Sequence, residues 1–95
     1  MASVLVVLPS ALRAFTNGER SVDGAVGDGA TVGDALGALG GSHPLLARRL
    51  FDETGRLRRY VNVYLDGVDV RIGDGMDTPV AGGAELLVLP SVAGG

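Results

Sequence analysis

Two apolar runs near opposite ends of this 95-residue chain constrain its fold more than any other feature. Residues 3–8 (SVLVVL) and 85–89 (ELLVL) are apolar at nearly every position, so an extended segment built from either would be apolar on both faces. Strands with this pattern are buried inside a sheet. We therefore expect the two to lie side by side in the sheet centre, in parallel, because the chain between them is long enough for the crossover.

The segment that follows the first run predicts a hairpin. A loop begins at Pro9 and ends at Asn17-Gly18, a pair that favours a tight turn. Residues 19–22 can then return as a second, half-exposed strand. Residues 24–30 are rich in glycine, and we expect them to be a connection.

The main helix is predicted to begin after Thr31. This residue is a suitable N-cap, and Asp34 three residues later makes a short variant of the capping box. Helical spacing places four apolar residues on one face: Val32, Ala35, Leu36 and Leu39. We expect the helix to end at Gly40-Gly41, followed by a short helical segment containing Leu45, Leu46 and Leu50 and a turn around Gly55.

A second hairpin is predicted near the C-terminal end. Residues 60–65 alternate between the apolar Val61, Val63 and Leu65 and the more polar Tyr60, Asn62 and Tyr64. Asp66-Gly67 is typical of a two-residue type I′ turn. Residues 68–72 alternate again, so we expect them to be the returning strand, with a polar, glycine-rich connection after it.

Together these elements predict an α+β fold. The order β-β-α-β-β-β, with parallel first and last strands, indicates a ubiquitin-like β-grasp: a mixed sheet of four to five strands with one main helix on one face. We expect residues 1–89 to form this domain and residues 90–95 to be a flexible tail ending in Gly-Gly.

Composition excludes several classes of function. The chain has no cysteine, which removes disulfides, thiolate nucleophiles and cysteine-based metal sites, and its one histidine, His43, cannot make a metal site alone. A net charge of −3 argues against a nucleic-acid partner, and no apolar run is long enough to span a membrane. No basic segment precedes the first apolar run, so we expect a cytoplasmic protein. All eight basic residues are arginine; the lack of lysine is explained either by a need to avoid self-acylation or, more simply, by compositional bias.

The chain resembles the MoaD/ThiS family of sulfur-carrier proteins, and most of all the CysO-type carriers of cysteine biosynthesis. The residues that carry the resemblance run nearly end to end: the opening strand into Leu8-Pro9, then Leu12-Arg13, residues 28–33 (DGATVG), 59–64 (RYVNVY), 69–71 (DVR) and 89–95 (LPSVAGG). The VNVY strand and the LPSVAGG tail are the specific parts, since a bare Gly-Gly end also occurs in ordinary termini.

The resemblance implies a protein cosubstrate rather than an enzyme, with no catalytic residue, metal or bound cofactor of its own. An E1-like adenylyltransferase would use ATP to activate the Gly95 carboxylate, and sulfur would then replace AMP to leave a thiocarboxylate. In the CysO-type branch, a pyridoxal-phosphate-dependent synthase uses this sulfur to make cysteine from O-phosphoserine, and a metallopeptidase releases the product.

The resemblance also assigns roles to individual residues. Gly94 and Gly95 are the sulfur-carrying end, and Val92 and Ala93 are the slim segment that enters the partner's active site. The exposed sheet face offers Tyr60, Asn62 and Tyr64 as docking residues, although such side chains can also simply shield a sheet through cross-strand packing. Arg56, Arg58 and Arg59 form a basic cluster that is either solvated or meets an acidic partner.

Two alternatives stay open at this point. Within the carrier class, the sulfur acceptor could be a precursor of molybdopterin or thiazole, or an intermediate of a sulfur-containing secondary metabolite, because the donor end is the same for each. In a different class, the chain could be a ubiquitin-like interaction module that never carries sulfur. Removal of Gly94-Gly95 would then leave partner binding unchanged.

Overall fold

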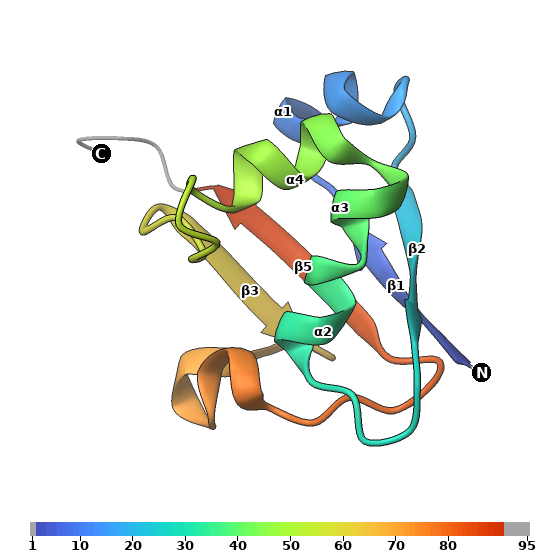
Figure 1. Ribbon diagram of the computed structural model, residues 1–95, viewed down its shortest axis with the longest axis vertical. Coiled ribbons are helices and arrows are strands. Elements are labelled where there is room, and N and C mark those ends of the chain that lie inside the picture. Colours follow the sequence, from blue (N-terminus) through green and yellow to red (C-terminus); the bar gives the residue numbers. More distant parts are fainter. Residues whose placement is uncertain (1, 91–95) are drawn as a thin grey trace.

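Strands β1 (Ala2–Val7) and β5 (Glu85–Pro90) are the central pair of the sheet in the computed structural model, which describes residues 2–90 (Figure 1). They run parallel, with Val6 opposite Leu86 and Val7 opposite Leu87. Over the described residues the sheet has five strands in the order β2-β1-β5-β3-β4, where β2 is Ser21–Val26, β3 is Val61–Leu65 and β4 is Val68–Asp69. β2 is antiparallel to β1, and β3 is antiparallel to both β5 and β4. The predicted mixed sheet and its parallel centre are confirmed.

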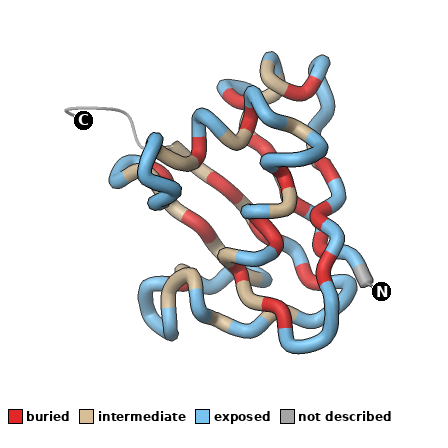
Figure 2. The backbone as a smooth tube through the Cα atoms, in the orientation of Figure 1, coloured by how far each residue is buried: buried red, intermediate tan, exposed pale blue. Residues whose placement is uncertain are grey.

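The helices cover one face of this sheet (Figure 1). They are α1 (Ser10–Arg13), α2 (Val32–Gly37), α3 (Leu39–Ser42) and α4 (Pro44–Leu50), with 3-10 turns η1 (Ala14–Thr16), η2 (Val70–Ile72) and η3 (Gly75–Asp77). Figure 2 shows the buried positions concentrated along the strands and on the helix surfaces that face them. The fully buried large side chains are Val4, Val6, Leu8, Val32, Leu36, Leu39, Leu46, Leu50, Val63, Leu86 and Val88. No helix in the described part of the chain is both long and apolar enough to cross a membrane.

The predicted start of α2 is confirmed by a complete capping box. The Thr31 hydroxyl accepts a hydrogen bond from the Asp34 backbone N–H at 3.1 Å, and the Asp34 carboxylate accepts one from the Thr31 N–H at 2.9 Å. Two backbone donors that a helix start leaves free are thereby satisfied.

The predicted end of this helix is wrong. Gly40 and Gly41 lie inside α3 rather than ending the helical region. Ala38 keeps right-handed helical angles, with φ −60° and ψ −23°, and Leu39 beyond it is fully buried. Burial of Leu39 thus continues the helical path, and outweighs the poor helix propensity of glycine.

Two strand assignments also need correction. β2 extends from Ser21 to Val26, through residues that the glycine content had placed in a connection. β4 stops at Asp69 instead of continuing to Ile72, because the Asp69 carboxylate accepts a hydrogen bond from the Arg71 N–H at 2.9 Å and caps η2. The stretch after Pro9 that was expected to be a loop contains α1 and η1.

Candidate functional site

The attachment point of the C-terminal tail is set by β5. Pro90, the last residue of this strand and of the described chain, lies opposite Val61 at the start of β3. Of the predicted tail, residues 91–95 lie outside the described residues, and they include the four assigned a role in sulfur transfer: Val92, Ala93, Gly94 and Gly95. Five residues follow Pro90 and span at most about 17 Å when extended. Any group on the final residue therefore acts within that radius of the end of β5.

A row of side chains crosses all five strands on the sheet face away from the helices. The strand registers place in this row Ser21, Val7, Leu87, Tyr64 and Asp69. In the next positions Leu89 lies opposite Asn62, and Leu5 lies opposite Glu85. Leu5 is 38% exposed, and the Tyr64 and Leu87 side chains are half-buried. An apolar strip therefore follows the two central strands on the open face, beside the strand that carries Asn62 and Tyr64.

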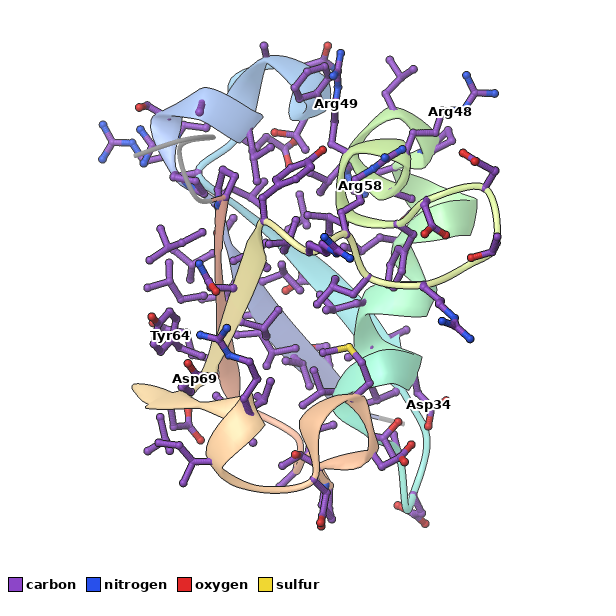
Figure 3. The ribbon with its side chains drawn as sticks, turned by 90° about the vertical axis from the view of Figure 1, so that its left-hand side faces the viewer. Asp34, Arg48, Arg49, Arg58, Tyr64 and Asp69 are labelled. Carbon is purple, nitrogen blue, oxygen red and sulfur yellow. The ribbon has the colours of Figure 1, made fainter. Side chains whose placement is uncertain are left out.

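The predicted docking residues separate into two groups. Asn62 and Tyr64 lie on this open face, and Figure 3 shows Tyr64 on the opposite side of the sheet from the helices. Tyr60 precedes β3 and lines a hollow on the helix side together with Phe15 and Arg49. The predictions did not include the apolar residues Leu5 and Leu87. The sequence did contain a signal for these two residues. A strand that is apolar on both faces exposes one apolar face when helices cover only the other face of the sheet.

The charges at the rim of the open face lie at the end of the β3–β4 hairpin. Asp69 and Arg71 form an ion pair at 2.7 Å, and hydrogen bonds from the Arg71 side chain, and then from its backbone N–H, lower the pKa of Asp69. The turn between β3 and β4 has φ values of 47° at Asp66 and 88° at Gly67, as the predicted type I′ turn requires. The Asp66 carboxylate also accepts a hydrogen bond from the Glu85 N–H at 2.9 Å. The hairpin is thus tied to the first residue of β5.

The side chains of residues 2–90 include no group of three or more His, Cys, Asp or Glu residues that could hold a metal ion. His43, the single histidine, has its Nδ1 atom 3.0 Å from the Ser42 hydroxyl. It is half-buried between α3 and α4 and lines a hollow with Glu19 and Asp23.

The parallel central strands, the antiparallel flanking strands and the helical layer on one face define a ubiquitin-like β-grasp protein. Residues 6–95 match the ThiS family, and the chain belongs to that family. This confirms the resemblance inferred from the sequence. The match includes the last strand, the open-face residues Asn62, Tyr64 and Leu87, and the terminal Gly94-Gly95.

Individual relatives are similar over almost their whole length. The sulfur carrier protein CysO of Mycobacterium tuberculosis is 39% identical over 95 residues, which cover 98% of this chain and 99% of that protein. The structure of small archaeal modifier protein 1 of Haloferax volcanii superposes with a TM-score of 0.84 at 36% identity, covering 97% of this chain and all of that one. CysO of Amycolatopsis orientalis, in its complex with BexX, has a TM-score of 0.82 at 38% identity, with 97% of this chain and 99% of that chain covered.

Proposed function

We propose that this chain is a sulfur carrier that transfers sulfur from a thiocarboxylate on Gly95. The observation that carries the proposal is the family match, which extends to residue 95 and so includes the terminal Gly94-Gly95. The full-length similarity to CysO proteins, which are named as sulfur carriers, supports it. In this role the chain is a cosubstrate, and its partners perform the catalysis.

The chemistry of the terminal carboxylate explains why a partner is needed. With a reference pKa near ~3.5, the carboxylate is ionised at neutral pH and has no leaving group. An E1-like adenylyltransferase solves this by letting the carboxylate attack the α-phosphate of ATP, which releases pyrophosphate and forms an acyl-adenylate. Sulfide displaces AMP from the acyl carbon directly; alternatively the terminal sulfur of a partner's persulfide displaces AMP to give an acyl disulfide, and a thiol reductant then cleaves its S–S bond and is itself oxidised to a disulfide. The product is a thiocarboxylate whose sulfur is a good nucleophile.

The slim tail suits delivery of this group to a partner. Val92, Ala93 and the two glycines carry little side-chain bulk, so an extended tail fits a narrow channel. The apolar strip on the open face, with Asn62 and Tyr64 beside it, supplies a surface on which the enzyme can rest while the tail occupies its active site. Binding and sulfur transfer are thereby assigned to different parts of the chain.

For the acceptor, we propose cysteine synthesis, as the resemblance to CysO-type carriers implies. Sulfur would pass to an electrophile formed from O-phosphoserine on a pyridoxal-phosphate-dependent synthase, and a metallopeptidase would release cysteine from the carrier. Supply to a molybdopterin or thiazole precursor, or to a secondary metabolite, uses the same donor end. An assay with the synthase distinguishes these acceptors. If cysteine synthesis is the function, cysteine should appear on Gly95 only when the thiocarboxylate form is incubated with O-phosphoserine and its synthase.

A second candidate function has specific support from relatives that are named modifier proteins. Small archaeal modifier protein 1 is 42% identical over 78 residues, which cover 82% of this chain. If this chain acts in that way, the activated Gly95 carboxyl would be joined to an amine on another protein, and sulfur would not be required. This chain has no lysine, so such a product would form on other proteins rather than on a lysine of a second copy.

Intact-mass measurement separates these functions. The chain is incubated with ATP, its candidate activating enzyme and sulfide, and fragmentation localises any change. Replacement of one Gly95 oxygen by sulfur supports the carrier function, and a variant lacking Gly94-Gly95 is the control that should show no change. An adenylate that forms but never gains sulfur, together with amide-linked conjugates, would favour the modifier function. An unmodified chain in the presence of a competent enzyme would contradict both.

A further inference from the structure

Three arginines gather around one open hollow at the end of the molecule formed by α4 (Figure 3). Arg48 and Arg49 belong to the last turn of α4, and Arg58 belongs to the segment that leads into β3. The hollow has a volume of about 380 Å³, and its other walls are Phe15, Leu45 and Tyr60. We call it the arginine groove. Its cations come from two separate elements, and the sequence cluster of Arg56, Arg58 and Arg59 contributes only Arg58.

Two of these arginines, Arg49 and Arg58, are held by contacts that do not neutralise them. The Arg49 guanidinium carbon lies 4.5 Å from the centroid of the Phe15 ring, within the range of a cation–π interaction. The Arg58 Nε–H donates a hydrogen bond to the Arg48 backbone carbonyl at 3.1 Å. The terminal nitrogens of Arg58, and the guanidinium of Arg48, remain able to pair with an anion. Two of the three cations are therefore positioned in advance for a charged ligand, and the exposed Arg48 guanidinium can turn toward it.

No carboxylate of the described residues forms an ion pair with Arg48, Arg49 or Arg58; within 2–90, the ion pair that occurs joins Asp69 and Arg71. The nearest acids, Asp52 and Glu53, border an adjoining hollow with Arg48 and Arg58. Asp52 is already engaged, because its carboxylate accepts hydrogen bonds from the Thr54 hydroxyl at 2.6 Å and the Thr54 N–H at 2.9 Å. Hydrogen bonds from the Thr54 hydroxyl and from the Arg56 and Thr54 N–H groups lower the pKa of Asp52, and the charge of Arg58 adds a smaller contribution. Arg48, Arg49 and Arg58 still outnumber these two neighbouring carboxylates, so the groove is complementary to an acidic partner.

The apolar walls of the arginine groove, and its position near the start of the tail, indicate what kind of partner it fits. Leu45 is 60% exposed and Tyr60 is 42% exposed, so the groove presents apolar surface beside its cations. Tyr60 directly precedes Val61, which lies opposite Pro90 where the tail begins. The groove therefore lies beside the residue where the tail begins, within reach of a protein that holds the end of the tail within about 17 Å of Pro90.

We propose that the arginine groove docks an acidic segment of the enzyme that activates the Gly95 carboxylate. Carboxylates of that segment pair with Arg48 and Arg58, and an apolar side chain between them packs on Leu45 and Tyr60. This inference rests on the proposed function, and it names the activating enzyme because every alternative for the sulfur acceptor requires one. The groove adds an electrostatic contact to the apolar contact of the open sheet face.

The test compares two double variants with the same change in net charge. Arg48→Glu/Arg58→Glu reverses the groove, whereas Arg56→Glu/Arg59→Glu reverses two exposed arginines that do not line it. Affinity for the activating enzyme is measured without ATP, and KM and kcat for thiocarboxylation are measured by intact mass. Circular dichroism and thermal unfolding establish that both variants are folded. Two milder variants accompany them. Arg48→Gln/Arg58→Gln neutralises the charge of the groove, and Leu45→Ser makes its apolar wall polar.

We expect the groove variant to raise Kd and KM by about tenfold or more with kcat nearly unchanged, and to lose most of the salt dependence of wild-type binding. The Arg56/Arg59 variant should stay within about threefold of wild type in both constants. Equal effects of the two double variants, or no effect of either, would overturn the groove as a docking site while leaving sulfur transfer intact.

Other outcomes separate the inference from the proposed function. If the wild-type chain binds the enzyme through the arginines but never gains sulfur, the docking site stands and sulfur transfer fails. If the wild-type chain does not bind the enzyme, both fail. If the groove variant loses affinity for a single-stranded oligonucleotide but keeps its affinity for the enzyme, the groove serves a nucleic acid and the proposal is wrong.

Discussion

Gly24 of β2 lies directly against the backbone of Ala35 in α2. A Cβ atom built at Gly24 would be 2.9 Å from the Ala35 carbonyl oxygen, closer than real Cβ atoms approach. The absence of a side chain at this strand position lets the helix sit close to the sheet. The glycine that made this segment look like a connection is thus a packing residue within a strand.

Gly24→Ala should therefore destabilise the fold. Because the clashing atom is backbone, relief requires α2 or β2 to shift, and we expect a loss of about 1–3 kcal/mol in the free energy of unfolding. Urea denaturation provides the measurement. Gly27→Ala is the matched control, since a Cβ there meets nothing within 4 Å, and it should change stability by less than about 0.5 kcal/mol. Equal stabilities for the two variants would mean that the contact relaxes freely.

Removal of the α2 cap should lower the free energy of unfolding by a measurable amount. Thr31→Ala loses the hydroxyl that accepts the Asp34 N–H, and we expect a loss of roughly 1 kcal/mol in unfolding free energy. Thr31→Ser retains the acceptor and should recover most of this loss. A Ser variant as unstable as the Ala variant would show that the methyl group, rather than the cap, is responsible.

Tyr64 distinguishes docking from shielding on the open face. As a docking residue beside Leu87, its replacement by alanine should reduce affinity for the activating enzyme by about 1 kcal/mol or more. Asp23→Ala, at the β2 edge of the same sheet, is the control and should bind like wild type. If Tyr64→Ala lowers the unfolding midpoint but leaves the affinity unchanged, this tyrosine only covers the sheet.

The pH dependence of stability should report the Asp69–Arg71 pair. Hydrogen bonds from the Arg71 side chain and backbone lower the pKa of Asp69 from its ordinary value of 3.8, so the folded state prefers the charged carboxylate. The stabilisation is therefore present above pH 3.8 and is lost as the pH falls below that value through the folded-state pKa. Asp69→Asn should be less stable than wild type at pH 7, and the difference should shrink toward pH 2. Urea midpoints across this range measure it, and a constant difference would contradict the assignment.

Deletion of Gly94-Gly95 should separate folding from function. The proposed function places the sulfur on Gly95, whereas the buried core of the described residues lies within residues 4–88. We expect the truncated chain to show no thiocarboxylate by intact mass and to keep the urea midpoint of the full chain. Adding back one glycine tests position: a chain ending at Gly94 should still fail if the tail length is set by the depth of the partner's active site.

Features that depend on local pattern could be predicted from the sequence. The two runs of residues 3–8 and 85–89 indicated the central parallel pair, because strands apolar on both faces must lie inside a sheet. The alternation of residues 60–65, the Asp66-Gly67 turn and the Thr31 cap followed from periodicity and side-chain chemistry within a few residues. These features, with the tail motif, were sufficient to indicate both the fold and the family.

Features that depend on contacts between distant residues were decided by the tertiary structure. Burial of Leu39 carried the helical path through Gly40 and Gly41, against their own preference. The arginine groove joins Arg49 to Phe15 and Arg58 to Arg48, contacts that no spacing in the sequence indicates. Periodicity, turn and capping patterns depend only on residues that are close along the chain. Packing free energy depends on which surfaces the completed fold brings together.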